Sequence, residues 1–539
     1  MWNTDWRDRV WDRLAEPWDI LVVGGGITGA GILREAARAG LRTLLVESGD
    51  FASGTSSRSS KLVHGGLRYL RDAKLRLTLV SVQERETLLN QGRGLVTPLG
   101  FLLANFERDK IPAWVFGMGL ILYDLMGLQW GHQHYGPEDL RELCPQLSDN
   151  QLTGGFRYFD AQTDDARLTL RVIREAVTDG GLALNYAHAH GLLKDRSGKV
   201  CGVQIVDRAP GAERRSAEVQ AQVVINATGA WADDLRQQVG ASARMRKLRG
   251  SHLVFNWEKL PINRAVTFLH PQDGRPVFAI PWEGVTLFGT TDVDQSNTLQ
   301  LEPRISPGEV DYLLSGMREV FPDADLTEND VRVTFAGVRG VVDTGKQDPS
   351  KESREHVLWQ ENGLVTVTGG KLTTFRVMAR DTLRSIRRRL PEEDKTQIDD
   401  HILDPVPSER CMPTALDGAT CQRLLGRYGR ETPALLAHAK SEDFERIGSG
   451  PYTWVELRFA AREEGVVRLD DLLLRRVRLG LTLPNGALQR IDRIRSVAQP
   501  ELGWSDERWN LEVERYQHKW DSAYRLTEGQ PSRKHTDKP

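Results

Sequence analysis

The sequence predicts an α/β (α+β overall) protein that ends in a helical C-terminal domain. Three observations support this class: a strand–helix–strand unit near the N-terminus, short apolar runs between turn residues from about 150 to 370, and helical periodicity rich in Arg and Glu after about 400. The chain has 539 residues, enough for two to four domains at roughly 150 residues each. Its 40% hydrophobic content is ample for large buried cores.

The first unit begins with the apolar run from Asp19 to Val23, which reads as a buried strand. A helical segment follows and closes at Gly40, and residues 42–47 form the second strand. Between the first strand and the helix lies Gly24-Gly-Gly-Ile-Thr-Gly29. At the equivalent places in a dinucleotide-binding turn, glycines permit the tight bend, the backbone approach to a pyrophosphate and close helix–strand packing, while the helix N-terminus offers free N–H groups. This is a Rossmann-like nucleotide site.

An acidic residue ends the second strand. Glu47 lies eighteen residues after Gly29, where a carboxylate accepts both ribose hydroxyls and its charge disfavours the 2′-phosphate of NADP. NAD and FAD both remain. Two later strands that end in small-residue turns, at Val223 to Gly229 and Leu364 to Lys371, favour FAD, because a long dinucleotide needs several close backbone approaches.

Charge and cysteine content exclude other classes. Lys and Arg number 72 against 74 Asp and Glu, whereas a dedicated nucleic-acid binder carries a basic excess, so we expect no nucleic-acid partner. The chain has four cysteines, which form no C-x-x-C pair and do not have zinc-finger spacing. We therefore expect reduced thiols and no bound metal. The first 18 residues lack the apolar region of a secretory signal, which predicts a cytoplasmic protein.

Two segments allow more than one interpretation. Asp164 and Asp165 resemble an acid–base pair, but we prefer an N-cap for a helix beginning near Ala166. The longest uncharged apolar stretch runs over thirteen residues, 111–123, and is too short for a membrane span of about twenty residues. We interpret it first as a core helix, with an interfacial segment as the alternative.

The chain also carries seven ordered motifs between residues 56 and 374. They are Ser56-Ser-Arg-Ser-Ser-Lys61, His64-Gly-Gly-Leu-Arg-Tyr69, Asp164-Asp-Ala-Arg-Leu168, Gly250-Ser-His252, Gly289-Thr-Thr-Asp292, Gly337-Val-Arg339 and Gly369-Gly-Lys-Leu-Thr-Thr374. Together they resemble the FAD-dependent (aerobic, respiratory) glycerol-3-phosphate dehydrogenases over roughly residues 17–530.

The resemblance implies a fold of the glutathione-reductase/amino-acid-oxidase type. An FAD-binding domain over residues 17–400 is interleaved with a substrate domain, mainly 75–160 and 240–350, that has a mainly antiparallel sheet. A helical cap follows at 401–527, and residues 1–16 and 528–539 form an N-terminal extension and a flexible tail.

The resemblance also implies a reaction. Members oxidise sn-glycerol 3-phosphate to dihydroxyacetone phosphate and pass electrons from FAD to a membrane quinone. A phosphate dianion needs fixed cations, and we assign this role to Arg68, Arg339 and Lys371. We assign His252 as the base for the C2 hydroxyl, with His64 as the runner-up or a flavin contact. Tyr69 and Thr374 complete the predicted catalytic set.

The predicted FAD contacts come from every glycine-rich turn. They are Gly24, Gly25, Gly26, Ile27, Thr28, Gly29, Glu47, Ser48, Ser56, Ser57, Ser60, Lys61, His64, Gly65, Gly66, Ala227, Thr228, Gly229, Gly370, Lys371, Leu372 and Thr373. No His or Cys stands at an obvious attachment position, so we expect noncovalent FAD.

Two other functions compete with this interpretation. A glycerol-3-phosphate oxidase would pass electrons to O₂ and make peroxide, and a flavin-holding protein without turnover would have lost the phosphate-binding cations. The oligomeric state stays open, a homodimer included. A quinone acceptor implies peripheral membrane contact, through the N-terminal segment with Trp2, Trp6, Val10 and Leu14 at helical spacing or through residues 114–128. The alternative for both is packing on the protein's own surface.

Overall fold

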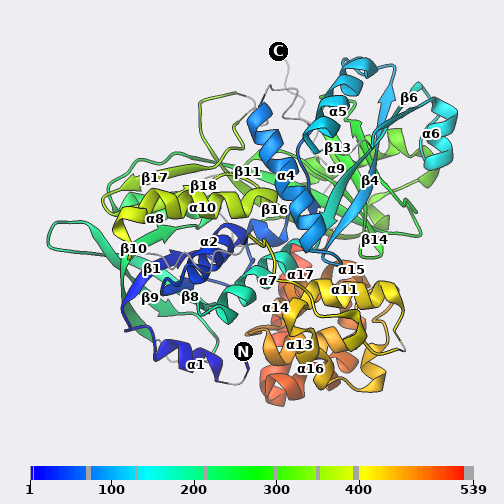
Figure 1. Cartoon of the computed structure of the whole chain (residues 1–539). Coiled ribbons are helices and arrows are strands. Elements are labelled where there is room, and N and C mark those ends of the chain that lie inside the picture. Colours follow the sequence, from blue (N-terminus) through cyan, green and yellow to red (C-terminus); the bar gives the residue numbers. More distant parts are fainter. Residues whose placement is uncertain are drawn as a thin grey trace, which may run out of the picture.

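The computed structural model describes residues 2–3, 5–67, 74–127, 131–211, 215–295, 302–347, 352–391, 400–414 and 416–526. Two sheets lie beside each other, and the helices of the C-terminal region pack below them, in orange and red in Figure 1. The predicted mixed α/β architecture with a helical C-terminal domain is confirmed.

The first sheet carries the N-terminal unit. Its main strand order is β17 (Val357–Glu361), β18 (Leu364–Thr368), β10 (Ser216–Asn226), β1 (Trp18–Val23), β2 (Thr43–Val46) and β7 (Leu182–Leu184). The five strands from β18 to β7 are parallel, and β17 is antiparallel. An antiparallel pair, β8 (Ala187–Lys194) and β9 (Val200–Asp207), extends β10.

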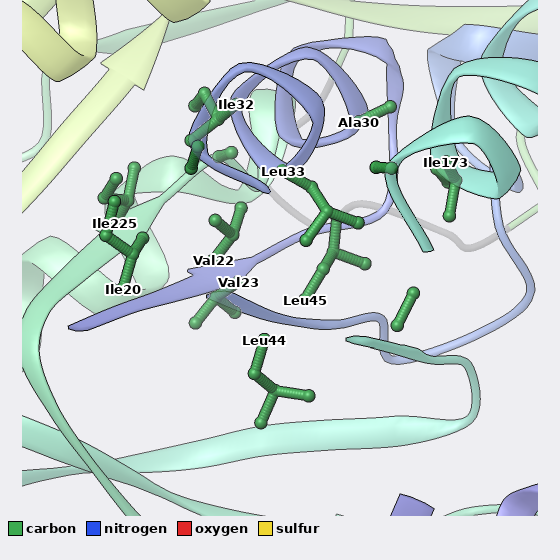
Figure 2. Close-up of a cluster of buried hydrophobic side chains, with 14 of the residues drawn as sticks. Ile20, Val22, Val23, Ala30, Ile32, Leu33, Leu44, Leu45, Ile173 and Ile225 are labelled. Carbon is green, nitrogen blue, oxygen red and sulfur yellow. The ribbon is translucent and has the colours of Figure 1, made fainter. Parts of the chain in front are cut away.

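Helices cover the parallel strands, which explains why those strands are apolar on both faces. The covering helices include α2 (Ile27–Arg38), α7 (Asp165–Thr178) and α10 (Phe375–Ile386), which pack against one another around α2. In Figure 2, Leu33 of α2 points toward Leu45 of β2 in the buried core between the helix and the strands. Asp164 is the N-cap of α7, as predicted, and its carboxylate accepts a hydrogen bond from the Arg167 amide at 3.2 Å.

The second sheet spans most of the predicted substrate domain and is mainly antiparallel, as expected. Its order is β15 (Val293–Asp294), β11 (Met245–Asn256), β14 (Val285–Gly289), β13 (Pro276–Trp282), β12 (Ala265–Leu269), β4 (Val96–Phe106), β6 (Leu152–Thr163) and β3 (Leu62–Val63). β16 (Val331–Val342) pairs with β11, and β5 (Gln133–Tyr135) pairs with β6. Only the β12–β4 pair among these described strands is parallel.

The remaining helices complete the domains. They are α1 (Trp6–Trp11), α4 (Leu75–Gln91), α5 (Ala113–Gly127), α6 (Pro137–Leu143), α8 (Ala232–Gln238), α9 (Pro307–Val320), α11 (Gly418–Tyr428), α12 (Thr432–Ala437), α13 (Trp454–Glu463), α14 (Leu469–Asp471), α15 (Leu479–Thr482), α16 (Ile491–Leu502) and α17 (Asp506–Ala523). Buried ion pairs join the C-terminal helices to the first domain: Arg476 binds Asp50 at 2.6 Å, and Arg427 binds Asp164 at 2.8 Å.

The N-terminal segment does not present an apolar face for a membrane. Trp2, Trp6, Val10 and Leu14 are all buried in the core of the first domain. The Trp2 ring stacks on Phe51, with 5.0 Å between centroids. The membrane-anchor hypothesis is therefore wrong for this segment, and its alternative, packing on the protein's own surface, is confirmed.

Helix α5 differs from the preferred core interpretation of residues 111–123. Its side chains Trp114, Met118, Ile121, Leu122 and Leu125 are exposed, Trp114 by 64%. Leu120, Tyr123 and Asp124 form its buried side. No helix among the described residues is long and apolar enough to cross a bilayer. The structure therefore leaves an apolar helix face at the surface of the predicted substrate domain.

Candidate active site

The glycine turn after β1 has the geometry of a dinucleotide cradle. Gly24 has a φ of +114°, and a Cβ there would lie 2.6 Å from the Ala227 carbonyl oxygen. A Cβ at Gly29 would lie 1.9 Å from the Gly24 carbonyl oxygen, so the close helix–strand packing requires glycine. Gly26, the N-cap of α2, has no side chain to cap the helix amides, which suits them to a diphosphate. Ser56 lies beside them, and its Oγ accepts from the Ile27 amide at 2.9 Å.

Glu47 lies next to this turn at the end of β2, as the sequence predicts. Its carboxylate accepts hydrogen bonds from the Gly25 amide at 2.7 Å and the Gly49 amide at 2.8 Å. Burial raises the pKa of the Glu47 carboxyl above its ordinary value. The side chain therefore supports the glycine turn itself, besides the ribose contact that we predict for it.

The later glycine turns lie at the same edge of the first sheet. β10 and β18 are adjacent parallel strands, with Val224 opposite Leu364, so the turns from Ala227 and Gly369 follow at neighbouring strand ends. Gly369 and Gly370 both have positive φ, +76° and +71°. Ligands of open α/β sheets bind at such carboxyl edges. Three backbone turns without large side chains fit a long dinucleotide such as FAD.

His252 lies in the middle of β11 and meets one of the predicted flavin residues. Its Nε2 is 2.9 Å from Ser60 Oγ, and its ring stacks on Phe335 with 4.6 Å between centroids. Nδ1 is buried and has no hydrogen-bond partner among the described residues. Burial first, and then the charges of Lys61 and Arg339, hold the pKa of His252 well below 6.5, so the imidazole is neutral at neutral pH.

Two arginines converge on one carboxylate near this histidine. Nη2 of Arg339 and Nη2 of Arg354 each lie 3.2 Å from an oxygen of Asp292. Arg354 Nε is buried without a hydrogen-bond partner in the described part of the chain. Two guanidinium groups thus lie together on one carboxylate, and guanidinium donors are the groups that bind phosphate oxygens in pairs. Sequence reasoning missed Arg354, since it stands in no glycine-rich motif and no local spacing marks it.

A second group of predicted residues meets around the segment 64–66, which follows β3. Thr373 Oγ1 accepts a hydrogen bond from the His64 amide at 3.2 Å and donates one to the His64 carbonyl at 3.3 Å. Lys371 Nζ donates to Ser81 Oγ at 3.1 Å. Thr374 is buried, and its hydroxyl is 3.5 Å from the Lys371 carbonyl oxygen. Arg68 and Tyr69 lie outside the described residues.

Other predicted FAD residues have structural partners. Lys61 is fully buried, and its ammonium donates to the Ser57 carbonyl at 2.7 Å and to Asp165 at 2.9 Å. Burial lowers the pKa of Lys61 to about 7. Ser48 Oγ lies 3.0 Å from His188 Nδ1. These bonds fix the loops after β2 and before β3, and direct FAD contacts by Ser57, Lys61 and Ser48 stay predictions.

The fold and this strand-edge cradle define a class of flavin-dependent oxidoreductase. Residues 19–405 match the family model of FAD dependent oxidoreductases, and residues 379–509 match the C-terminal domain of alpha-glycerophosphate oxidase. The chain is 32% identical to the aerobic glycerol-3-phosphate dehydrogenase of Staphylococcus haemolyticus over 86% of each chain. It is 31% identical to the Staphylococcus saprophyticus protein of the same name over 94% of each. The chain belongs to the aerobic glycerol-3-phosphate dehydrogenase family, and its cofactor is FAD.

A solved structure resembles the whole chain. The glycerol-3-phosphate dehydrogenase from Bacillus halodurans, complexed with FAD, superposes with a TM-score of 0.78 at 29% identity. The match covers 97% of this chain and 98% of that one. The likeness extends through the C-terminal helices, so the helical domain is part of the shared architecture.

Proposed function

We propose that the chain oxidises sn-glycerol 3-phosphate at C2 to dihydroxyacetone phosphate and passes the electrons to a quinone. The observation that carries the substrate assignment is a neutral, buried His252 close to the pair Arg339 and Arg354 on Asp292. A neutral base suits the hydroxyl group of a phosphorylated alcohol, and a pair of arginines suits its phosphate. The family membership supports the same substrate.

The side chains divide the chemistry between them. Arg339 and Arg354 bind the phosphate, with Lys371 as the third predicted cation. His252 takes the proton of the C2 hydroxyl, and Ser60 holds the imidazole orientation through Nε2. Bound FAD supplies the hydride acceptor, held noncovalently by the glycine turns after β1, β10 and β18.

Removing Arg354 tests the phosphate site. A hydrogen bond to a charged group contributes about 1.5–3 kcal/mol, so Arg354→Ala and Arg339→Ala should each raise KM for glycerol 3-phosphate roughly ten- to a hundred-fold. Flavin content should stay complete. Steady-state kinetics measure this, with Arg108→Ala as the control, because Arg108 pairs with Glu319 away from the cradle. Unchanged KM in both site variants would place the phosphate elsewhere.

The apolar face of α5 supports a lipid-dissolved acceptor. Trp114, Met118 and Leu125 are more than half exposed. On the other side of the helix, a Cβ at Gly119 would lie 3.8 Å from Leu67, directly after the segment 64–66. The helix thus lies between that segment and the outside. A helix that lies in the plane of the membrane, with an apolar face that includes Trp, is suited to the headgroup region of a bilayer. Such contact would bring the enzyme to the lipid in which a quinone is dissolved.

We expect α5 to bind vesicles. Burying a Leu or Ile side chain is worth about 1.5–3 kcal/mol, so Ile121→Asp with Leu125→Asp should lower the vesicle partition constant by about 10²-fold or more. Sedimentation with anionic liposomes at low salt measures this. The control is Leu511→Asp, which alters an exposed leucine of α17 in the C-terminal domain. Equal sedimentation of the α5 variant and the parent chain would remove α5 as the contact.

The reaction and its acceptor need separate assays. Anaerobic addition of glycerol 3-phosphate should bleach the flavin absorbance, and no bleaching would contradict the dehydrogenase proposal. Turnover with a soluble quinone analogue is then compared with peroxide yield in air. Quinone reduction should be much faster, and a dominant peroxide yield would instead identify a glycerol-3-phosphate oxidase.

A further inference from the structure

A buried polar cluster lies between α5 and the segment 64–66. Tyr123 of α5, Asp160 of β6 and Arg85 of α4 are each at most 5% exposed. The Gly65 amide donates to Tyr123 Oη at 2.8 Å and is 3.3 Å from Asp160 Oδ1. Tyr123 and Asp160 therefore meet at one backbone amide of the predicted flavin segment, and Arg85 bonds both of them.

The cluster has a defined hydrogen-bond direction. Tyr123 Oη donates to Asp160 Oδ1 at 2.8 Å, and Arg85 Nη1 donates to Tyr123 Oη at 3.0 Å and to Asp160 at 2.7 Å. Burial raises the pKa of Tyr123 well above 10, so the phenol keeps its proton. The phenol O–H donates to Asp160, and the phenol oxygen accepts hydrogen bonds from the Gly65 amide and from Arg85. The ion pair of Arg85 with Asp160 compensates the buried charge.

Steric contact adds to these bonds. A Cβ at Gly65 would lie 2.4 Å from Tyr123 Oη and 2.4 Å from Val82 Cγ2, so the phenol and α4 enclose this amide. On the neighbouring residue, Thr373 Oγ1 bonds both the amide and the carbonyl of His64. The segment is thus held from two sides, by the FAD-binding domain through Thr373 and by the substrate domain through Tyr123.

We propose that Tyr123 is a positioning residue for the flavin reaction: its hydroxyl fixes the Gly65 peptide and so orients the backbone of His64 and Gly66, which we predict to contact FAD. The inference rests on the proposed function, because it needs this segment at the flavin. It also gives α5 two roles, an apolar outer face and an inner side that holds the segment 64–66. Misplacing a reacting group by about 1 Å can cost about 10²-fold in rate.

The test is Tyr123→Phe, which removes the hydroxyl and keeps the ring. We expect the rate constant of anaerobic flavin reduction by glycerol 3-phosphate to fall about ten- to a hundred-fold. The substrate Kd from the same stopped-flow data should change by less than about threefold, and the flavin midpoint potential should shift. The matched control is Tyr158→Phe, a buried tyrosine of β6 whose ring stacks on Phe101 at 5.1 Å and whose reduction rate should stay at the parent value.

The outcomes separate the two proposals. If the parent enzyme shows no flavin reduction, the proposed function fails. If the parent is reduced and Tyr123→Phe matches it in rate and potential, the positioning role is overturned. Should Tyr123→Phe lose flavin or fold poorly, Asp160→Asn, which keeps the size and one acceptor oxygen, replaces it. If Asp160→Asn reduces its flavin more slowly than the parent while its substrate Kd is unchanged, the positioning role of the cluster is supported. A reduction rate and a midpoint potential like those of the parent contradict it.

Discussion

Glu47→Arg protein should purify without flavin. The carboxylate of Glu47 accepts the amides of Gly25 and Gly49, and we expect it to accept the ribose hydroxyls as well. A guanidinium offers donors only, so the charge reversal removes every one of these acceptors. Each of the two lost ribose bonds is worth about 1.5–3 kcal/mol, so FAD binding should weaken by roughly 10²–10⁴-fold, and the loss of the amide contacts loosens the glycine turn as well. The flavin-to-protein absorbance ratio measures the effect.

Two further variants make this result specific to the site. Glu47→Gln keeps an acceptor oxygen, and it should retain flavin with affinity lowered roughly ten- to a hundred-fold. Glu218→Arg makes the same charge change at an exposed position of β10 and should keep full flavin. Circular dichroism must confirm that Glu47→Arg is folded. A folded Glu47→Arg protein with full flavin would disprove the assignment of this strand end.

The parallel sheet could be predicted because its signals are local. Buried strands between helices are apolar on both faces. Glycine is required at Gly24 in the tight turn after β1 and at Gly29, where α2 packs closely against that turn. The strand end at Glu47 follows from the same short unit. The N-cap at Asp164 is likewise set within three residues.

The site could be predicted only in part, because its contacts join distant segments. Ser60 and His252 are 192 residues apart, and nothing in either motif indicates that they meet. Arg354 joins Asp292 across 62 residues and has no motif of its own. The sequence supplies candidate side chains, whereas the pairing of β11 with β16 decides which of them share a site.

The two surface helices show what hydropathy leaves undecided. Residues 111–123 are apolar on all sides, so no periodicity reveals which face is buried. The N-terminal segment has an apolar face, but its partner is the protein itself. Arg7 binds Asp207 at 2.6 Å, and Arg174 of α7 lies over the Trp2 ring at 5.2 Å, so both residues of the segment have partners within the fold.

The other large effect is expected for His252→Ala. Loss of a general base lowers kcat by about 10²–10⁴-fold, while the phosphate contacts of Arg339 and Arg354 should keep KM within a few-fold. Burial and the charges of Lys61 and Arg339 lower the pKa of His252, which favours the neutral base. In the parent enzyme, kcat/KM should therefore fall only below pH 6.5, because His252 of the free enzyme becomes protonated only at such acid pH.

The pH profile distinguishes a base from a residue that only shapes the pocket. If His252 is the base, its acid limb disappears in His252→Ala, and Arg339→Ala moves the limb to higher pH because one of the charges that lower its pKa is gone. Ser60→Ala, which removes the hydroxyl at Nε2, should lower kcat less than His252→Ala does, since the imidazole itself remains. A loss confined to KM in His252→Ala, with the acid limb intact, would transfer the base role to another group, and His64→Ala is then the variant to measure. Assignment of His252 as the base thus requires two results in His252→Ala: a fall in kcat and the loss of the acid limb. If the histidine were merely structural, the acid limb would remain.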